Sequence, residues 1–142
     1  MIPVKQTTRG GGDAPKEERG DCFSACMASL LELDITEVPR FCELDDDDWG
    51  PAIAAWLKGF GLAYLELVHS EYVQQIRAEW GFHIVSATSP RGLRHSVIAY
   101  KQRLVFDPHP DIPDQKPELL PQDEDNEWVV GVLIPLEPAN WR

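Results

Sequence analysis

The sequence predicts an α+β domain in which helices come first and a mainly antiparallel sheet follows. Apolar residues recur at helical spacing between residues 21 and 60, and at every second position from residue 81 onward. A turn-forming stretch at residues 89–92 separates the first two of the later apolar stretches. The length of 142 residues suits one compact domain and no internal repeat is visible, so we expect a single domain over residues 1–142.

The first 20 residues are expected to form an extended arm and a flexible loop, with three consecutive glycines at residues 10–12 as its loosest point. Helical spacing starts directly after Gly20, and Asp21 is a suitable N-cap for the helix that follows. The helical pattern fades near Asp34. Its predicted apolar stripe consists of Phe23, Cys26, Met27, Leu30 and Leu31.

A second helix is predicted after the acidic run at residues 45–48, because acidic residues at a helix start complement the helix dipole. The glycines at positions 59 and 61 close it. Its apolar positions are Trp49, Ile53, Trp56, Leu57 and Phe60.

The remaining elements are a short helix and a series of strands. The helix is expected over residues 71–80, with Tyr72, Val73 and Ile76 facing inward. Strands are predicted over residues 62–68, 82–88, 95–100, 103–106 and 128–135.

The chain is strongly acidic, with 24 Asp and Glu against 13 Lys and Arg and a net charge of −11. Such a surface repels phosphate groups, so neither nucleic acid nor an anionic membrane is an expected partner. Three cysteines cannot all pair within one chain, and no apolar segment resembles a signal peptide or a membrane span. We therefore expect free thiols and a cytoplasmic location, with the oligomeric state left open.

Cys22 stands at the first turn of the first predicted helix. At that position the free backbone N–H groups and the helix dipole stabilise a thiolate, which is the nucleophilic form of cysteine. Cys26 lies one turn later on the apolar stripe, where core packing explains it. For Cys22 alone, an ordinary half-buried thiol remains the competing interpretation.

A histidine and an aspartate follow Cys22 on two adjacent predicted strands. His95 opens an apolar strand after a polar turn, and Asp107 ends the next strand. A carboxylate within about 2.6–3.2 Å of one imidazole nitrogen would orient the ring, and the other nitrogen would face Cys22. A regular two-residue turn at residues 101–102 would instead place His95 and Asp107 on opposite faces. The triad therefore requires a longer turn, a bulge or a bend after the strand.

Residues 20–27, Gly-Asp-Cys-Phe-Ser-Ala-Cys-Met, resemble the nucleophile helix of papain-like cysteine peptidases. The nearest resemblance is to peptidase domains that trim bacteriocin leaders at double-glycine sites. They share an Asp-Cys-x-x-Ala-Cys pattern, a later His-x-Val strand and an Asp-Pro after the next strand, here Asp107-Pro108. A group of small bacterial and phage proteins is also similar, through Gln-Thr near the start, Gly-Asp-Cys, Ser-Pro-Arg-Gly and Asp-Pro-His-Pro. The resemblance covers roughly residues 1–111.

The resemblance implies a papain-like fold, in which an N-terminal nucleophile helix packs on a mainly antiparallel sheet, and a triad of Cys22, His95 and Asp107. Papain-like sites also use a glutamine upstream of the cysteine as an oxyanion donor, and Gln6 is the only glutamine before Cys22. In the leader peptidases that glutamine stands only a few residues upstream. Here the glycine-rich insert would have to loop out to bring Gln6 to the site.

Three further polar residues have weaker assignments. Arg91 is a candidate substrate-binding residue at the cleft rim that could meet a carboxylate, although a solvated side chain explains it as well. His83 alternates with apolar neighbours and is expected to be a satisfied structural histidine. His109 lies in a rigid, proline-flanked stretch and is expected to be a surface ring, not a second base.

The expected activity is hydrolysis of an amide, isopeptide or related acyl bond through a thioester on Cys22, with a peptide, a protein or a small amide as substrate. An acyltransferase would use the same triad. A non-catalytic papain-like binding protein is a further alternative. A zinc module is weaker, because the second tight ligand pair is missing, and no cofactor or metal is expected. The ligands of such a zinc module would be Cys22, Cys26, His95 and His109.

Overall fold

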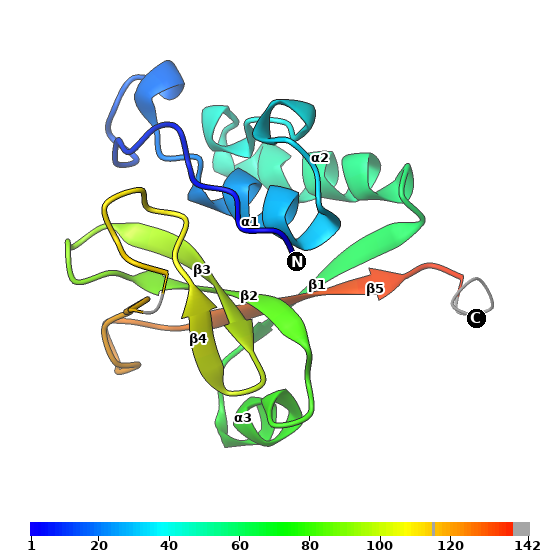
Figure 1. The fold of residues 1–142 in the computed structure, drawn as a ribbon, viewed down its shortest axis with the longest axis vertical. Helices are drawn as coiled ribbons and strands as arrows, with labels where there is room; N and C mark the ends of the chain where they lie inside the picture. The colour runs from blue at the N-terminus through cyan, green and yellow to red at the C-terminus, as the bar shows by residue number, and fades with distance from the viewer. Residues whose placement is uncertain (115, 138–142) are drawn as a thin grey trace.

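The computed structural model describes residues 1–114 and 116–137, in which helices precede a five-stranded antiparallel sheet (Figure 1). The predicted range 1–142 therefore includes positions 115 and 138–142, which lie outside the described residues. The α-helices are α1 (Cys22–Leu31), α2 (Asp46–Lys58) and α3 (Glu71–Arg77). The strands are β1 (Leu62–Val68), β2 (Phe82–Thr88), β3 (Arg94–Tyr100), β4 (Arg103–Phe106) and β5 (Val129–Pro135). Short 3-10 turns occur at Lys16–Glu18, Ile35–Glu37 and Phe41–Glu43. The predicted α+β class is confirmed.

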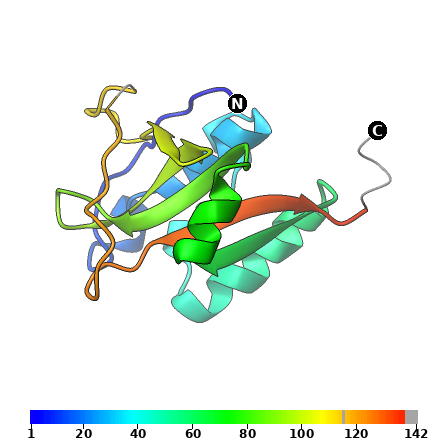
Figure 2. The same ribbon diagram turned by 90° about the horizontal axis from the view of Figure 1, so that it is seen from below.

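The sheet has the strand order β1-β5-β2-β3-β4 and separates two apolar clusters. Helices α1 and α2 lie on one side of it and α3 lies on the other (Figures 1 and 2). Met27 of α1 and Leu57 of α2 are buried in the first cluster together with Ile98 of β3. Val73 of α3 and Val85 of β2 are buried in the second. The central strands are thus covered on both faces, and no helix among the described residues is long and apolar enough to cross a membrane.

The predicted strand ranges agree closely with the structure. β1, β2 and β4 have the predicted bounds, β3 begins one residue earlier at Arg94, and β5 begins one residue later at Val129. The third helix ends at Arg77 instead of residue 80. Its predicted inward face is partly wrong, because Val73 is buried but Tyr72 is 71% exposed.

Arg77 is buried on α3 because it binds His83. Arg77 Nε donates a hydrogen bond to His83 Nε2 at 2.9 Å, and His83 Nδ1 donates to the Gly81 carbonyl at 2.8 Å. Burial lowers the pKa of His83 to about 4, the charge of Arg77 adds to this, and the Gly81 carbonyl acts against it. The ring is therefore neutral, and the expected satisfied structural histidine is confirmed.

The connection between β3 and β4 decides whether His95 and Asp107 share a face of the sheet. Positions 100 and 103 pair across a two-residue turn, and positions 99 and 104 follow, but position 98 pairs with 106. Val105 is therefore the extra residue of a β-bulge. Continuing the shifted register places Asp107 opposite Val97, on the same face as His95, whereas a regular hairpin would have placed it opposite Ser96. A bulge is one of the arrangements that the predicted triad requires.

Gly131 of β5 provides a test of the packing on the sheet. The ring of Tyr64 lies so close to Gly131 that an added Cβ would overlap it. Tyr64 in turn packs edge-on against Phe23, with ring centres 5.4 Å apart, so its ring has little freedom to move away. We expect Gly131→Ala to lower the free energy of unfolding by about 1–3 kcal/mol, as measured by urea denaturation.

Gly50→Ala is the matched control, because Gly50 lies in α2 with open space around the position of a Cβ. Alanine is favoured over glycine inside a helix by up to about 1 kcal/mol. This variant should therefore be as stable as the parent or more stable. Equal destabilisation by the two substitutions would contradict the packing of Tyr64 on Gly131.

Candidate active site

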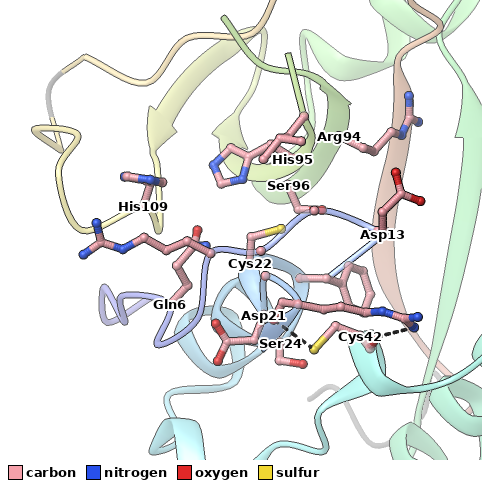
Figure 3. Close-up of a pocket in the computed structure, with 18 of the residues that line it drawn as sticks. Gln6, Asp13, Asp21, Cys22, Ser24, Cys42, Arg94, His95, Ser96 and His109 are labelled. Atoms are coloured by element: carbon pink, nitrogen blue, oxygen red, sulfur yellow. Dashed lines mark hydrogen bonds between the residues drawn. The ribbon is translucent and has the colours of Figure 1, made fainter. Parts of the chain in front are cut away.

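Cys22 is the first residue of α1 and lies half-buried in a cleft of about 770 Å³ (Figure 3). The glycine-rich loop, the start of α2 and the turn between β2 and β3 contribute to its walls. Figure 3 shows the His95 ring next to the Cys22 sulfur, with Gln6 and His109 to one side and Asp13 to the other. Residues from the N-terminal arm, from the helices and from β3 and the segment after β4 therefore meet at one thiol.

His95 lies between Cys22 and Asp107. His95 Nε2 and Asp107 Oδ1 are 2.6 Å apart, and both side chains are almost fully buried. The Cys22 side chain lies beside the same ring and raises its pKa (Figure 3). Because Nε2 is engaged by Asp107, Nδ1 is the nitrogen left to face the sulfur. The geometry expected for Asp107 and His95 is confirmed, and the three residues lie together.

The buried pair has shifted pKa values. Burial opposes the charge on His95, but hydrogen bonds to Asp107 and Cys22, and the charges of both, raise its pKa to about 9. Burial also opposes ionisation of Asp107. The hydrogen bond and charge of His95, the backbone N–H of His109 and the charge of Arg91 nevertheless hold its pKa below the ordinary value. At neutral pH the pair is therefore an imidazolium and a carboxylate.

Asp21 occupies the N-cap position of α1, but the expected side-chain cap is wrong. Its carboxylate accepts hydrogen bonds from the backbone N–H groups of Thr7 at 2.8 Å and Thr8 at 3.0 Å, and from the Thr7 hydroxyl at 2.6 Å. Arg40 pairs with it at 3.3 Å. The carboxylate thus binds the N-terminal arm and leaves the first turn of α1 open beside Cys22. No local pattern indicates these partners, which are 13 to 19 residues away.

Gln6 reaches the cleft because the glycine-rich loop closes at its base. The Gly10 N–H donates to the Glu18 carbonyl at 2.7 Å, and the Gly20 N–H donates to the Gly10 carbonyl at 2.7 Å. A Cβ on Gly10 would overlap the Glu18 carbonyl, so glycine is required at this close approach. The insert therefore loops out, as the position of Gln6 requires.

The Gln6 side chain is 6% exposed and lines the cleft. Its Nε2 donates one hydrogen bond to the Thr8 carbonyl at 2.8 Å, which leaves its second N–H available. Its Oε1 is buried and has no hydrogen-bond partner in residues 1–114 and 116–137. Gln6 is thus placed where an oxyanion donor could act.

Arg91 and His109 lie at the same cleft. Arg91 is exposed there, as expected for a residue of the rim. The His109 ring centre is 6.4 Å from that of His95, and its Nδ1 accepts the Asp111 backbone N–H at 3.2 Å. Burial and the charges of Arg91 and Arg9 lower the pKa of His109. These features favour His95 over His109 as the base.

The other two thiols have different surroundings. Cys26 is fully buried, its Sγ contacts the Ser96 carbonyl at 3.5 Å, and burial raises its pKa well above the ordinary value. The Cys42 Sγ contacts the Arg19 carbonyl at 3.6 Å, and burial raises its pKa as well. Core packing thus accounts for Cys26, which is not available to the zinc site considered above. Across the described part of the chain, no group of three or more His, Cys, Asp or Glu is placed to hold a metal ion.

No protein-family model, curated protein or solved structure matches the chain. What the protein does has to be inferred from the chemistry of the cleft.

The titration of His95 tests the geometry of the pair. We expect a pKa near 9 in the parent, a lower value in Cys22→Ala and the lowest in Asp107→Asn, because the Asp107 hydrogen bond is the largest effect that raises it. An asparagine can still accept a hydrogen bond from the ring, but it has no charge to stabilise the imidazolium, so burial should bring the pKa down toward the ordinary value of about 6.5. The histidine ring signals can be followed by NMR as a function of pH.

His83 is the internal control for this titration. Its pKa of about 4 depends on burial and on contacts that neither substitution touches, so it should stay unchanged in all three proteins. A parent in which His95 titrates near its ordinary value would show that the pair does not form in solution.

Proposed function

We propose that the protein is a papain-like cysteine hydrolase that cleaves an amide, isopeptide or related acyl bond through a thioester on Cys22. The observation that supports this best is the buried His95–Asp107 pair, 2.6 Å apart, beside a cysteine at an uncapped helix start. Nucleophile, base and orienting acid are then in the relative positions that the chemistry needs.

Acylation uses the thiolate of Cys22, which forms when His95 takes the thiol proton or is held as an ion pair with protonated His95. Sγ forms a bond to the carbonyl carbon, and the π electrons of the C=O bond move to its oxygen. The backbone N–H of Cys22 and the second Nε2–H of Gln6 can donate to that oxyanion. When the intermediate collapses, the C–N bond breaks and His95 gives its proton to the leaving amine. The acyl group remains on Cys22 as a thioester.

Deacylation returns the site to its starting state. Neutral His95 takes a proton from water while the water oxygen bonds to the thioester carbon. The C–S bond then breaks, Cys22 leaves as a thiolate beside the new imidazolium, and the acid is released. Asp107 keeps the ring in one orientation through both steps. If another nucleophile replaces water, the same residues perform acyl transfer.

The proposed substrate is a peptide, a protein or a small amide whose reacting carbonyl enters the open cleft. Arg91 at the rim is the proposed partner for a carboxylate of that substrate. All three cysteines are free thiols. A reducing compartment such as the cytoplasm, where the Cys22 thiol would stay reduced, is therefore part of the proposal.

Intact-mass profiling with a panel of activated acyl esters and peptidyl vinyl sulfones tests the proposal. We expect one covalent adduct on Cys22, because only this thiol lies beside the His95–Asp107 pair. His95→Ala should slow adduct formation by about 100-fold or more. Asp107→Asn should slow it less than Cys22→Ala does, since an amide can still accept a hydrogen bond from the ring.

Two variants serve as matched controls. Cys42→Ser removes another thiol of the same cleft, and His109→Ala removes the neighbouring imidazole; both should leave the adduct on Cys22 at close to the parent rate. Preferential labelling of Cys42 would overturn the assignment, and a folded protein without any adduct would favour the non-catalytic binding protein. Release of the acyl group to an added amine in preference to water would identify an acyltransferase.

A further inference from the structure

Lys5 of the N-terminal arm binds the segment that follows β4. Its Nζ donates to the backbone carbonyls of Asp107 at 2.9 Å, Ile112 at 3.1 Å and His109 at 3.4 Å. It also pairs with the Asp114 carboxylate at 2.7 Å. One ammonium group thus contacts four acceptors that are more than 100 residues away in the sequence. The arm (dark blue) and this segment (yellow) lie side by side in Figure 1.

The segment needs donors from elsewhere because it lies beyond the sheet. β4 ends at Phe106, and three of the residues 107–114 are prolines, which have no backbone N–H to donate. Gln6, the neighbour of Lys5, donates its backbone N–H to the Pro108 carbonyl at 2.9 Å. The Lys5 ammonium also lies 4.9 Å above the Phe106 ring centre. The arm therefore fixes the chain directly before, at and after position 107.

Asp107 is consequently held through both its backbone and its side chain. Lys5 binds its backbone carbonyl, and His95 binds its carboxylate at 2.6 Å. The Lys5–Asp114 ion pair is partly exposed, so it contributes little by itself. The bonds from the charged ammonium to three carbonyls are the stronger constraint on the backbone.

We propose that Lys5 is a positioning residue for the acid of the site: it fixes the backbone at Asp107 so that the carboxylate stays on His95. The consequence for catalysis rests on the proposed function, whereas the positioning can be measured on His95 alone. If the segment loosens, the His95–Asp107 bond is made less often, and the imidazolium loses its main support. The reaction of Cys22 should then slow.

Lys5→Met tests this in the full chain, with two readouts. The first is the pKa of His95 by NMR, which should fall from about 9 toward or below its ordinary value. The second is the rate of Cys22 alkylation by iodoacetamide at pH 7, located by peptide mapping, which should fall about tenfold because the base is misoriented. Lys5→Gln, which keeps a donor without the charge, replaces Lys5→Met if that protein does not fold.

Lys116→Met is the matched control, since it removes the same charge from an exposed position further along the same connection. It should leave the pKa of His95 unchanged and the alkylation rate of Cys22 within about twofold of the parent. A lower melting temperature in Lys5→Met with an unchanged His95 titration would mean that Lys5 is only structural, and the inference would fail. A parent whose Cys22 is not the preferred site of alkylation would count against the proposed function instead. The His95 titration would still decide the role of Lys5.

Discussion

The hydrogen bond between Asp107 and His95 is the contact on which the rest of the site depends. Both side chains are almost fully buried, and a buried charge is costly unless it is paired and hydrogen-bonded. A regular β3–β4 hairpin would bury a carboxylate and an imidazole on opposite faces of the sheet, with neither satisfied. The bulge at Val105 avoids that outcome because it shifts the strand pairing by one residue before the chain reaches Asp107. The same irregularity therefore serves the stability of the fold and the chemistry of the cleft.

At the start of α1, too, a feature that costs the helix stability contributes to the site. An aspartate at the N-cap normally satisfies the first free N–H groups of a helix, and losing such a cap costs about 1 kcal/mol. Asp21 stands at that position but binds Thr7, Thr8 and Arg40 instead. The start of α1 therefore has no side-chain cap from Asp21, and in the proposed reaction the backbone N–H of Cys22 can donate to the oxyanion. Exceptions to the usual capping pattern are expected where a site needs unsatisfied backbone groups. Here the exception also holds the arm that contains Gln6, because the Asp21 carboxylate binds Thr7 and Thr8.

Local patterns predicted the elements well, because apolar runs bounded by turn residues mark the strands of a sheet that is covered on both faces. The order of Cys22, His95 and Asp107 was recognisable because a nucleophile, a base and an acid are chemically distinct residue types. Contacts across the sequence were not predictable. The inward orientation expected for Tyr72 is wrong because the buried pair of Arg77 with a residue of β2 sets the face of α3. The alternatives for the β3–β4 connection could be stated, but nothing local selects the bulge among them.

The cleft also differs in charge from the rest of the molecule. The chain has a net charge of −11, yet the described residues that line the cleft include four arginines and four aspartates. They are Arg9, Arg19, Arg91 and Arg94, and Asp13, Asp21, Asp45 and Asp46. Long-range attraction of cations is therefore a property of the remaining surface, not of this cleft. A cleft of balanced charge suits a neutral reacting group such as an amide. In the proposed reaction, the charge that acts on the amide comes from the thiolate of Cys22 and the imidazolium of His95, whose protonated form Asp107 stabilises.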